Sequence, residues 1–183
     1  RRPGIRRIFV IQILLRLFYA LMVIYTPLYL LDLGFSPTKI GIIFSLMIIP
    51  FVVLSYPLGH YADKRWGEKE LLIAGFLVTA LATSAIAFID STQLLIWAVV
   101  LITTRIGAAT VEIMNEIYFF KHIEEDDTDT LGAFRMLRPV GYILAPFIGI
   151  VVLYIADMRF IFFILSLFLL VGVYVSALLR DTK

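Results

Sequence analysis

The chain has 183 residues, of which 61% are hydrophobic and only 16% charged, and its mean hydropathy is +0.97. A soluble domain of this size could not cover so much apolar side-chain surface, so the composition indicates an integral membrane protein in contact with the lipid bilayer. The net charge of +2 says little by itself, and the absence of cysteine excludes disulfides and thiolate metal sites.

Six apolar segments are long enough to cross a hydrocarbon layer of roughly 30 Å as helices. Their apolar runs are continuous and do not alternate with polar residues, which favours helices over the strands of a barrel. The predicted helices cover residues 8–31, 38–61, 70–89, 93–120, 131–155 and 160–179. We therefore predict an all-α membrane protein in which residues 1–183 form a single six-helix transmembrane domain.

Turn signals separate the predicted helices. Gly34-Phe35-Ser36-Pro37 ends the first helix, and Ser36 or Thr38 is placed to cap the second. Asp129 or Thr130 is placed to cap the fifth helix, after an acidic loop.

The basic residues gather on one side of the predicted bundle. Six helices put both chain ends on the same side, which also holds the N-terminal arginines, whereas only Lys39 and Arg159 fall on the opposite side. The positive-inside rule therefore predicts cytoplasmic termini, in an inner or plasma membrane. An arginine lies within each of the first and fourth helices (Arg16, Arg105), and prolines lie in the second and fifth. This weak symmetry predicts a 3+3 inverted repeat, the pattern of many transporters.

The fourth predicted helix carries charges at membrane depth. At 100° per residue, Arg105, Glu112 and Glu116 share one face of this helix. A charge at the centre of a bilayer costs roughly 2.5–3.5 kcal/mol on insertion scales, so such side chains normally face protein or water. The stripe is therefore predicted to point away from lipid.

The first predicted helix offers a matching polar face, formed by Gln12, Arg16 and Tyr19. Counted along the helices, Arg16 and Glu112 lie at comparable depth, so an ion pair between them is geometrically reasonable. Two interpretations stay open. The charges form a structural network that fixes helix packing, or they line a hydrated cavity in which the acids titrate or meet a solute and the arginines bind an anion.

The densest charge cluster, GHYADKRWGEK, lies between the second and third predicted helices. Glycine at its first position lets a neighbouring backbone approach, and the second glycine permits a tight reversal. The candidate residues of this loop are Gly59, Asp63, Lys64, Arg65, Gly67 and Lys69.

The spacing of this loop resembles the signature G-x-x-x-D-(R/K)-x-G-x-(R/K) of the major facilitator superfamily. It departs in one respect, because three residues separate Asp63 from Gly67 where the usual pattern has two. The segment from Arg105 to Ala109 and the Asp157–Phe160 turn are similar to two further features of that family. The chain as a whole resembles one six-helix half of such a transporter. Its basic start, without methionine, leads us to expect the C-terminal half.

The resemblance implies a secondary active transporter that moves a small molecule or ion by alternating access between two six-helix halves, with proton coupling as one option. It implies that the first and fourth helices line the cavity. It also implies that Asp63 meets the start of the fifth helix of the other half, as a latch that breaks on inward opening. The alternative is that this loop only reverses the chain and sets its membrane topology, without a role in gating.

Two other classes of function stay open. A non-transporting membrane scaffold would assemble through small-residue ridges such as Gly141, Ala145 and Gly149. An intramembrane enzyme would need a catalytic constellation that the sequence does not show, so we expect no enzyme, no cofactor, no metal site and no nucleic-acid partner. Among the aromatic residues, we expect Tyr25, Tyr29 and Trp97 to be interfacial anchors and the phenylalanines of the last helix, Phe162 among them, to face lipid.

Overall fold

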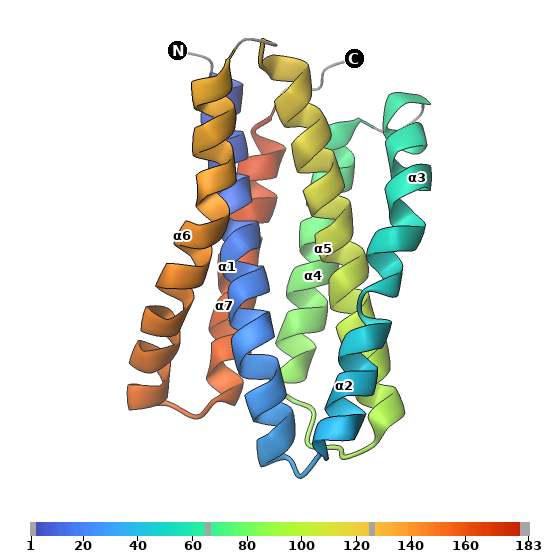
Figure 1. Cartoon of the computed structure of the whole chain (residues 1–183), viewed down its shortest axis with the longest axis vertical. Coiled ribbons are helices and arrows are strands. Elements are labelled where there is room, and N and C mark those ends of the chain that lie inside the picture. Colours follow the sequence, from blue (N-terminus) through green and yellow to red (C-terminus); the bar gives the residue numbers. More distant parts are fainter. Residues whose placement is uncertain (1–2, 65–66, 125–126, 180–183) are drawn as a thin grey trace.

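The computed structural model describes residues 3–64, 67–124 and 127–179, and the side chains of residues 3 and 59–64 are also outside its description. Across these ranges the chain is helical and contains no strand (Figure 1). The helices are α1 (Pro3–Asp32), α2 (Pro37–Leu46), α3 (Ile49–Lys64), α4 (Glu68–Ile86), α5 (Leu94–His122), α6 (Thr128–Ile155) and α7 (Arg159–Ala177). With α2 and α3 counted together, six described helices are long and apolar enough to span a membrane. The predicted all-α membrane fold is confirmed.

The turn between α1 and α2 follows from the residues at the ends of the two helices. Gly34 adopts a positive φ of 89°, its amide donates to Leu31 O at 2.9 Å, and the next amide donates to Leu30 O at 3.0 Å. These two bonds form a Schellman motif, which closes α1. Ser36 then caps α2 by accepting from the Lys39 amide, and Pro37 occupies the first turn. The predicted turn and cap are confirmed.

The second membrane span is interrupted, whereas the sequence predicted one continuous helix over residues 38–61. The break falls at Met47 and Ile48, between α2 and α3. Pro50 explains its position, since proline lacks an amide hydrogen for the carbonyl of Leu46 and its ring crowds that carbonyl. Proline is tolerated at Pro50 itself because it lies in the first turn of α3.

Replacing Pro50 by alanine is expected to join α2 and α3 into one helix, because the missing hydrogen-bond donor is restored. Hydrogen–deuterium exchange of residues 47–51 should then slow by about tenfold or more as these amides enter a helical ladder. Pro57→Ala is the matched control, since Pro57 lies inside α3 without interrupting it. Equal exchange at the break in the Pro50→Ala variant and the unaltered protein would contradict this explanation.

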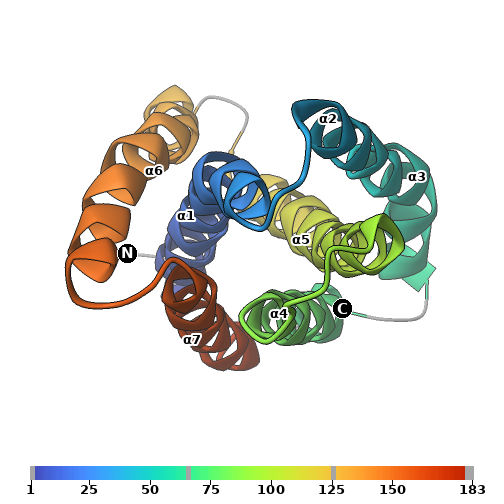
Figure 2. The ribbon, with the colours of Figure 1, turned by 90° about the horizontal axis from the view of Figure 1, so that it is seen from below.

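The spans are arranged as two sets of three related by an approximate twofold axis (Figure 2). Helices α1 and α5 touch at the centre, where α6 packs on α1 and α3 packs on α5. Helix α7 packs on α1 as α4 packs on α5, and α4 and α7 contact each other. The packing of α6 and α7 on α1 thus corresponds to the packing of α3 and α4 on α5, which is consistent with the predicted 3+3 repeat. The start of α1 and the end of α7 lie at the same end of the bundle (Figure 1).

Small residues let the central helices approach closely. A Cβ atom on Gly107 of α5 would lie 2.7 Å from the carbonyl oxygen of Gly75 on α4. A Cβ atom on Gly141 of α6 would lie 3.0 Å from the carbonyl carbon of Arg16 on α1. Gly141, Ala145 and Gly149 are all buried. The predicted small-residue ridge of α6 therefore packs against α1.

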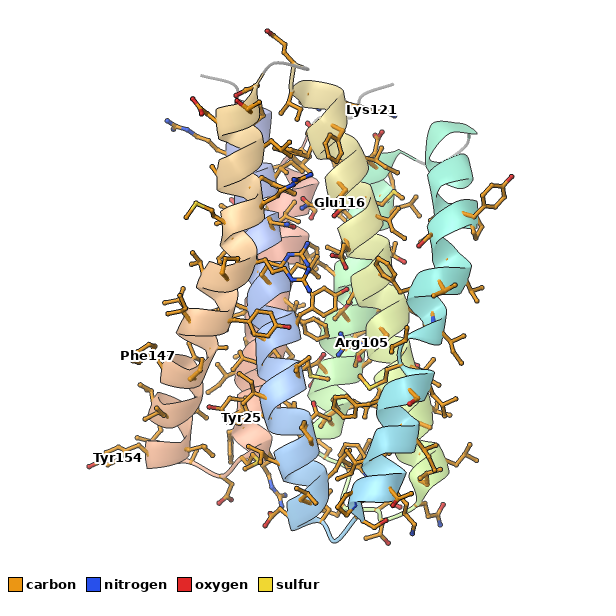
Figure 3. The ribbon with its side chains drawn as sticks, in the orientation of Figure 1. Tyr25, Arg105, Glu116, Lys121, Phe147 and Tyr154 are labelled. Atoms are coloured by element: carbon orange, nitrogen blue, oxygen red, sulfur yellow. The ribbon has the colours of Figure 1, made fainter. Side chains whose placement is uncertain are left out.

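The aromatic residues of the core correct two expectations. Tyr25, Tyr29 and Trp97 are 5%, 3% and 0% exposed, so they are core residues and not interfacial anchors. The Trp97 indole donates to the carbonyl of Ser91 at 2.7 Å, which satisfies its polar atom inside the bundle. Phe162 is also fully buried, with its ring 5.4 Å from that of Tyr29. The residues that do face outward include Phe147 and Tyr154 of α6, which point away from the bundle (Figure 3).

Candidate functional site

A cavity of about 610 Å³ opens on one face of the bundle. Helices α1, α2, α3, α5 and α6 line it together with the break at Met47 and Ile48, while α4 and α7 contribute no residue. Its polar lining consists of Arg16, Tyr19, Ser45, Arg105, Glu112, Arg138 and Tyr142. Its apolar lining consists of Val23, Phe44, Met47, Ile48, Phe51 and Ala109. The volume is in the usual range for a small-molecule site.

An ion pair joins α1 to α5 in the wall of the cavity. Arg16 Nη1 lies 2.8 Å from Glu112 Oε1, and the two side chains are 11% and 14% exposed. The Tyr19 hydroxyl donates to the other carboxylate oxygen of Glu112 at 2.9 Å. Arg16 and Tyr19 reach the same carboxylate because residues three apart lie on one face of a helix. The ion pair predicted from helix depth is confirmed.

Arg105 also lines the cavity, about two turns of α5 from Glu112 and between α1 and α5 (Figure 3). Its Cζ atom lies 5.1 Å from the ring centroid of Tyr19 and 6.0 Å from that of Phe18, so two aromatic rings hold the guanidinium group by cation–π contact. Its Nε atom is buried and has no hydrogen-bond partner within residues 3–64, 67–124 and 127–179. Nor does any carboxylate of those residues form an ion pair with it.

A buried amide pair extends the network beside the Arg16–Glu112 ion pair. Asn115 of α5 and Gln12 of α1 are 0% and 2% exposed, and their side-chain amides lie 2.9 Å apart. With the Gln12 amide turned by 180°, its oxygen accepts from Arg16 Nε at 3.2 Å and from Nη2 at 3.1 Å. The network thus links Asn115 of α5 to Gln12 of α1, Gln12 to Arg16, and Arg16 to Glu112 of α5. Asn115 was not predicted, although it lies three residues from Glu112.

Glu116 lies apart from the main cavity. It lines a second cavity of about 450 Å³ together with Arg16, Arg135 and Arg138. This cavity lies closer to the end of the bundle at which α1 begins, where Glu116 is exposed (Figure 3). The structure therefore brings Arg16, Tyr19, Arg105 and Glu112 together in the main cavity. Glu116 is absent from that cavity, and it meets Arg16 and Arg138 only in the second one.

The loop between the second and third spans is described only in part. Gly59, Asp63 and Lys64 belong to the last turns of α3 with their side chains outside the description, and Arg65 is outside it altogether. Gly67 is the N-cap of α4 with φ −67° and ψ 158°, a conformation open to any residue. The conformational freedom of glycine is therefore not what Gly67 supplies to the reversal. Lys69 lies half-buried in the first turn of α4. The latch role of Asp63 stays a prediction.

An ion pair beside this loop was not predicted. Glu68, which is 2% exposed, accepts from Lys121 Nζ at 2.6 Å. The pair joins the first turn of α4 to the last turn of α5. Glu68 is also placed favourably for the dipole of α4, and Lys121 for that of α5.

The contribution of α6 to the cavity lining was also not predicted. Arg138 and Tyr142 both face the cavity from this helix. The available signal was their spacing of four residues, which puts them on one face, next to the ridge that begins at Gly141.

The family model described as Major Facilitator Superfamily matches residues 8–183. The match begins within α1 and includes every later helix of the described chain.

Proposed function

Because the chain belongs to the major facilitator superfamily, a family of transporters, we propose that it is one six-helix half of a secondary transporter that moves a small solute by alternating access. In this proposal the other half covers the face formed by α1, α2, α3, α5 and α6. The solute then lies between the two halves, near the middle of the membrane.

The observation that carries the proposal is the charged cavity on this face. A transmembrane scaffold has no need of ionisable side chains at membrane depth, where each charge is costly. Here Arg16, Arg105 and Glu112 all line a cavity of solute size, and Arg16 and Glu112 form an ion pair in its wall.

The Arg16–Glu112 ion pair also suggests how solute movement is coupled to an ion. Protonation of Glu112 would remove its negative charge and release the guanidinium group of Arg16 from the pair. The cavity would then differ between the two protonation states in its affinity for a solute, as proton coupling requires. We include proton coupling in the proposal on this basis.

The loop after α3 completes the proposal. Asp63 would bind the start of the fifth helix of the other half in the outward-facing state, and Lys64, Arg65 and Lys69 would pair with acids of the same gate. Both chain ends would be cytoplasmic.

Reconstituted vesicles test the proposal. The full-length protein is placed in liposomes loaded with the pH indicator pyranine, and amino acids, sugars, organic acids and amines are added one at a time. We expect saturable uptake of at least one solute class together with a pH change inside the vesicles. Glu112→Gln should lower the coupled flux by about tenfold or more, a loss of about 1.4 kcal/mol or more in the transport barrier.

Glu116→Gln is the matched control, because Glu116 lies one turn from Glu112 but outside the main cavity. It should keep most of the flux. Normal coupling in the Glu112→Gln variant would remove Glu112 from the mechanism. If no solute moved and the protein held a partner through α6 after detergent extraction, the scaffold alternative would replace the transporter.

A further inference from the structure

The charges that line the main cavity do not balance. Three of its lining residues are arginines and one is a glutamate. Glu112 is already bound to Arg16 at 2.8 Å and accepts a hydrogen bond from Tyr19. Within the described part of the chain, Arg105 and Arg138 have no carboxylate in ion-pair distance. This face of the cavity therefore carries an excess of positive charge.

Arg105 is the better placed of these two arginines to bind an anion. Its guanidinium group is held over the Tyr19 ring, so its orientation is fixed before a solute arrives. Its buried Nε atom lacks a hydrogen-bond partner among the described residues. A buried cation without a counterion is costly, and an oxyanion in the cavity would supply both the missing charge and the missing acceptor.

The side of the cavity formed by the break between α2 and α3 is mostly apolar, and the hydroxyl of Ser45 there donates to the Gly41 carbonyl at 2.9 Å. Its wall around the break between α2 and α3 is formed by Phe44, Met47, Ile48 and Phe51, with Val23 of α1. None of these side chains offers a hydrogen-bond donor to an anionic group. A solute that fills the cavity therefore needs one charged end and an apolar body.

We infer that the cavity binds an organic monoanion, with its carboxylate on Arg105 and its aliphatic or aromatic body against the break between α2 and α3. The transport of this anion rests on the proposed function, but its binding does not. The Arg16–Glu112 pair stays intact beside the bound carboxylate and provides no net charge to it.

Three molecules of nearly equal shape test the charge of the ligand. Benzoate, benzamide and benzamidinium carry an anionic, a neutral and a cationic group on the same ring, and their binding to the purified full-length protein is measured by calorimetry in detergent. Benzoate should bind about tenfold or more tightly than benzamide, a difference of about 1.4 kcal/mol. Benzamidinium should not compete with benzoate. Equal binding of benzoate and benzamide by the unaltered protein overturns the inference.

Acetate tests the apolar end of the site. It carries the same carboxylate without the ring, so it should bind about tenfold or more weakly than benzoate because less apolar surface is buried. Acetate binding as tight as that of benzoate would show that the apolar wall takes no part, and would overturn the assignment of an organic body.

Arg105→Gln tests whether Arg105 binds the carboxylate. This variant should lose the preference for benzoate over benzamide, and Arg105→Lys should retain part of it. Arg135→Gln is the matched control, since it removes an arginine of α6 that lines only the second cavity. An unchanged preference in Arg105→Gln overturns the assignment. If that variant does not fold, the three-ligand comparison on the unaltered protein still decides the charge of the ligand.

Flux measurements separate this inference from the proposed function. Saturable transport of a sugar or an amine, with no selectivity for benzoate, would leave the transporter standing and remove the anion site. Selective binding of benzoate without flux of any solute would confirm the anion site and remove the transporter.

Discussion

Glu112→Leu is expected to destabilise the protein by about 3–5 kcal/mol, because it leaves the guanidinium group of Arg16 without its counter-charge inside the bundle. Both members of the pair are largely buried, at 11% and 14% exposure, so water does not replace the lost carboxylate well. Tyr19 loses its acceptor in the same variant. Unfolding in mixed micelles, followed by circular dichroism, measures the loss.

A double-mutant cycle separates the ion pair from ordinary packing. Arg16→Met together with Glu112→Leu removes both charges and keeps similar side-chain volumes, so the double variant should recover most of the stability that Glu112→Leu loses. Glu116→Leu is the control, since this carboxylate is exposed at the second cavity, and it should change stability by less than about 1 kcal/mol. Additive effects of the Arg16 and Glu112 substitutions would show that the pair is not coupled.

Gly107→Leu is expected to cost about 3 kcal/mol or more, because the contact it would break is between backbones. A single Cβ atom at this position already lies 2.7 Å from the Gly75 carbonyl oxygen and 2.8 Å from the Thr79 amide nitrogen. Side-chain rotation cannot relieve a clash with backbone atoms, so α4 and α5 must move apart. The midpoint of thermal unfolding in detergent should fall accordingly.

Gly41→Leu provides the comparison for Gly107→Leu. Gly41 lies within α2 and is exposed, and a Cβ atom there meets nothing within 4 Å. The same substitution should therefore leave the unfolding midpoint nearly unchanged, or raise it slightly through the higher helix propensity of leucine. Comparable losses in both variants would mean that close packing of α4 on α5 does not determine stability.

Features that depend on local chemistry were predictable from the sequence. The positive φ of Gly34 and the Ser36 cap follow from residues within one turn of each other. The Arg16–Glu112 pair follows from helix rise and from the cost of a charge in the membrane. The predicted N-cap of α6 was wrong, however. Asp127, and not Asp129 or Thr130, is the N-cap of α6, where it accepts from the Thr130 amide.

Features that depend on which face of a helix is buried were less predictable. In a soluble protein, polar residues mark the outer face of a helix, but in a membrane both the core and the lipid face are apolar. Hydropathy therefore could not show that Tyr29, Trp97 and Phe162 are core residues. Proline was ambiguous in the same way. Pro50 ends a helix, while Pro57, Pro139 and Pro146 lie inside continuous ones.

The residues of the candidate site were likewise predicted only in part. Its charged members on α1 and α5 were predicted because isolated charges stand out in apolar helices. Arg138 was missed because it lies close to the start of the predicted fifth helix, where a long basic side chain can reach the lipid headgroups without facing a cavity. Asn115 was missed because an amide gives no charge signal, although it is fully buried in the structure.

The two flanks of the cavity, α6 on one side and the break between α2 and α3 on the other, differ in how firmly their backbones are held. On one side, Gly141 of α6 lies against the main chain of α1 at Arg16, and Gly149 lies against Tyr25 two turns and more further along. These close contacts hold the backbones of α6 and α1 together along this flank. On the other side, the regular ladder of backbone hydrogen bonds is interrupted between α2 and α3, where the amides of Ile48 and Phe51 donate only to carbonyls three residues back. Bending there can reshape the apolar wall while the charges stay fixed, so the cavity can adjust to solutes of different girth without disturbing the ion pair.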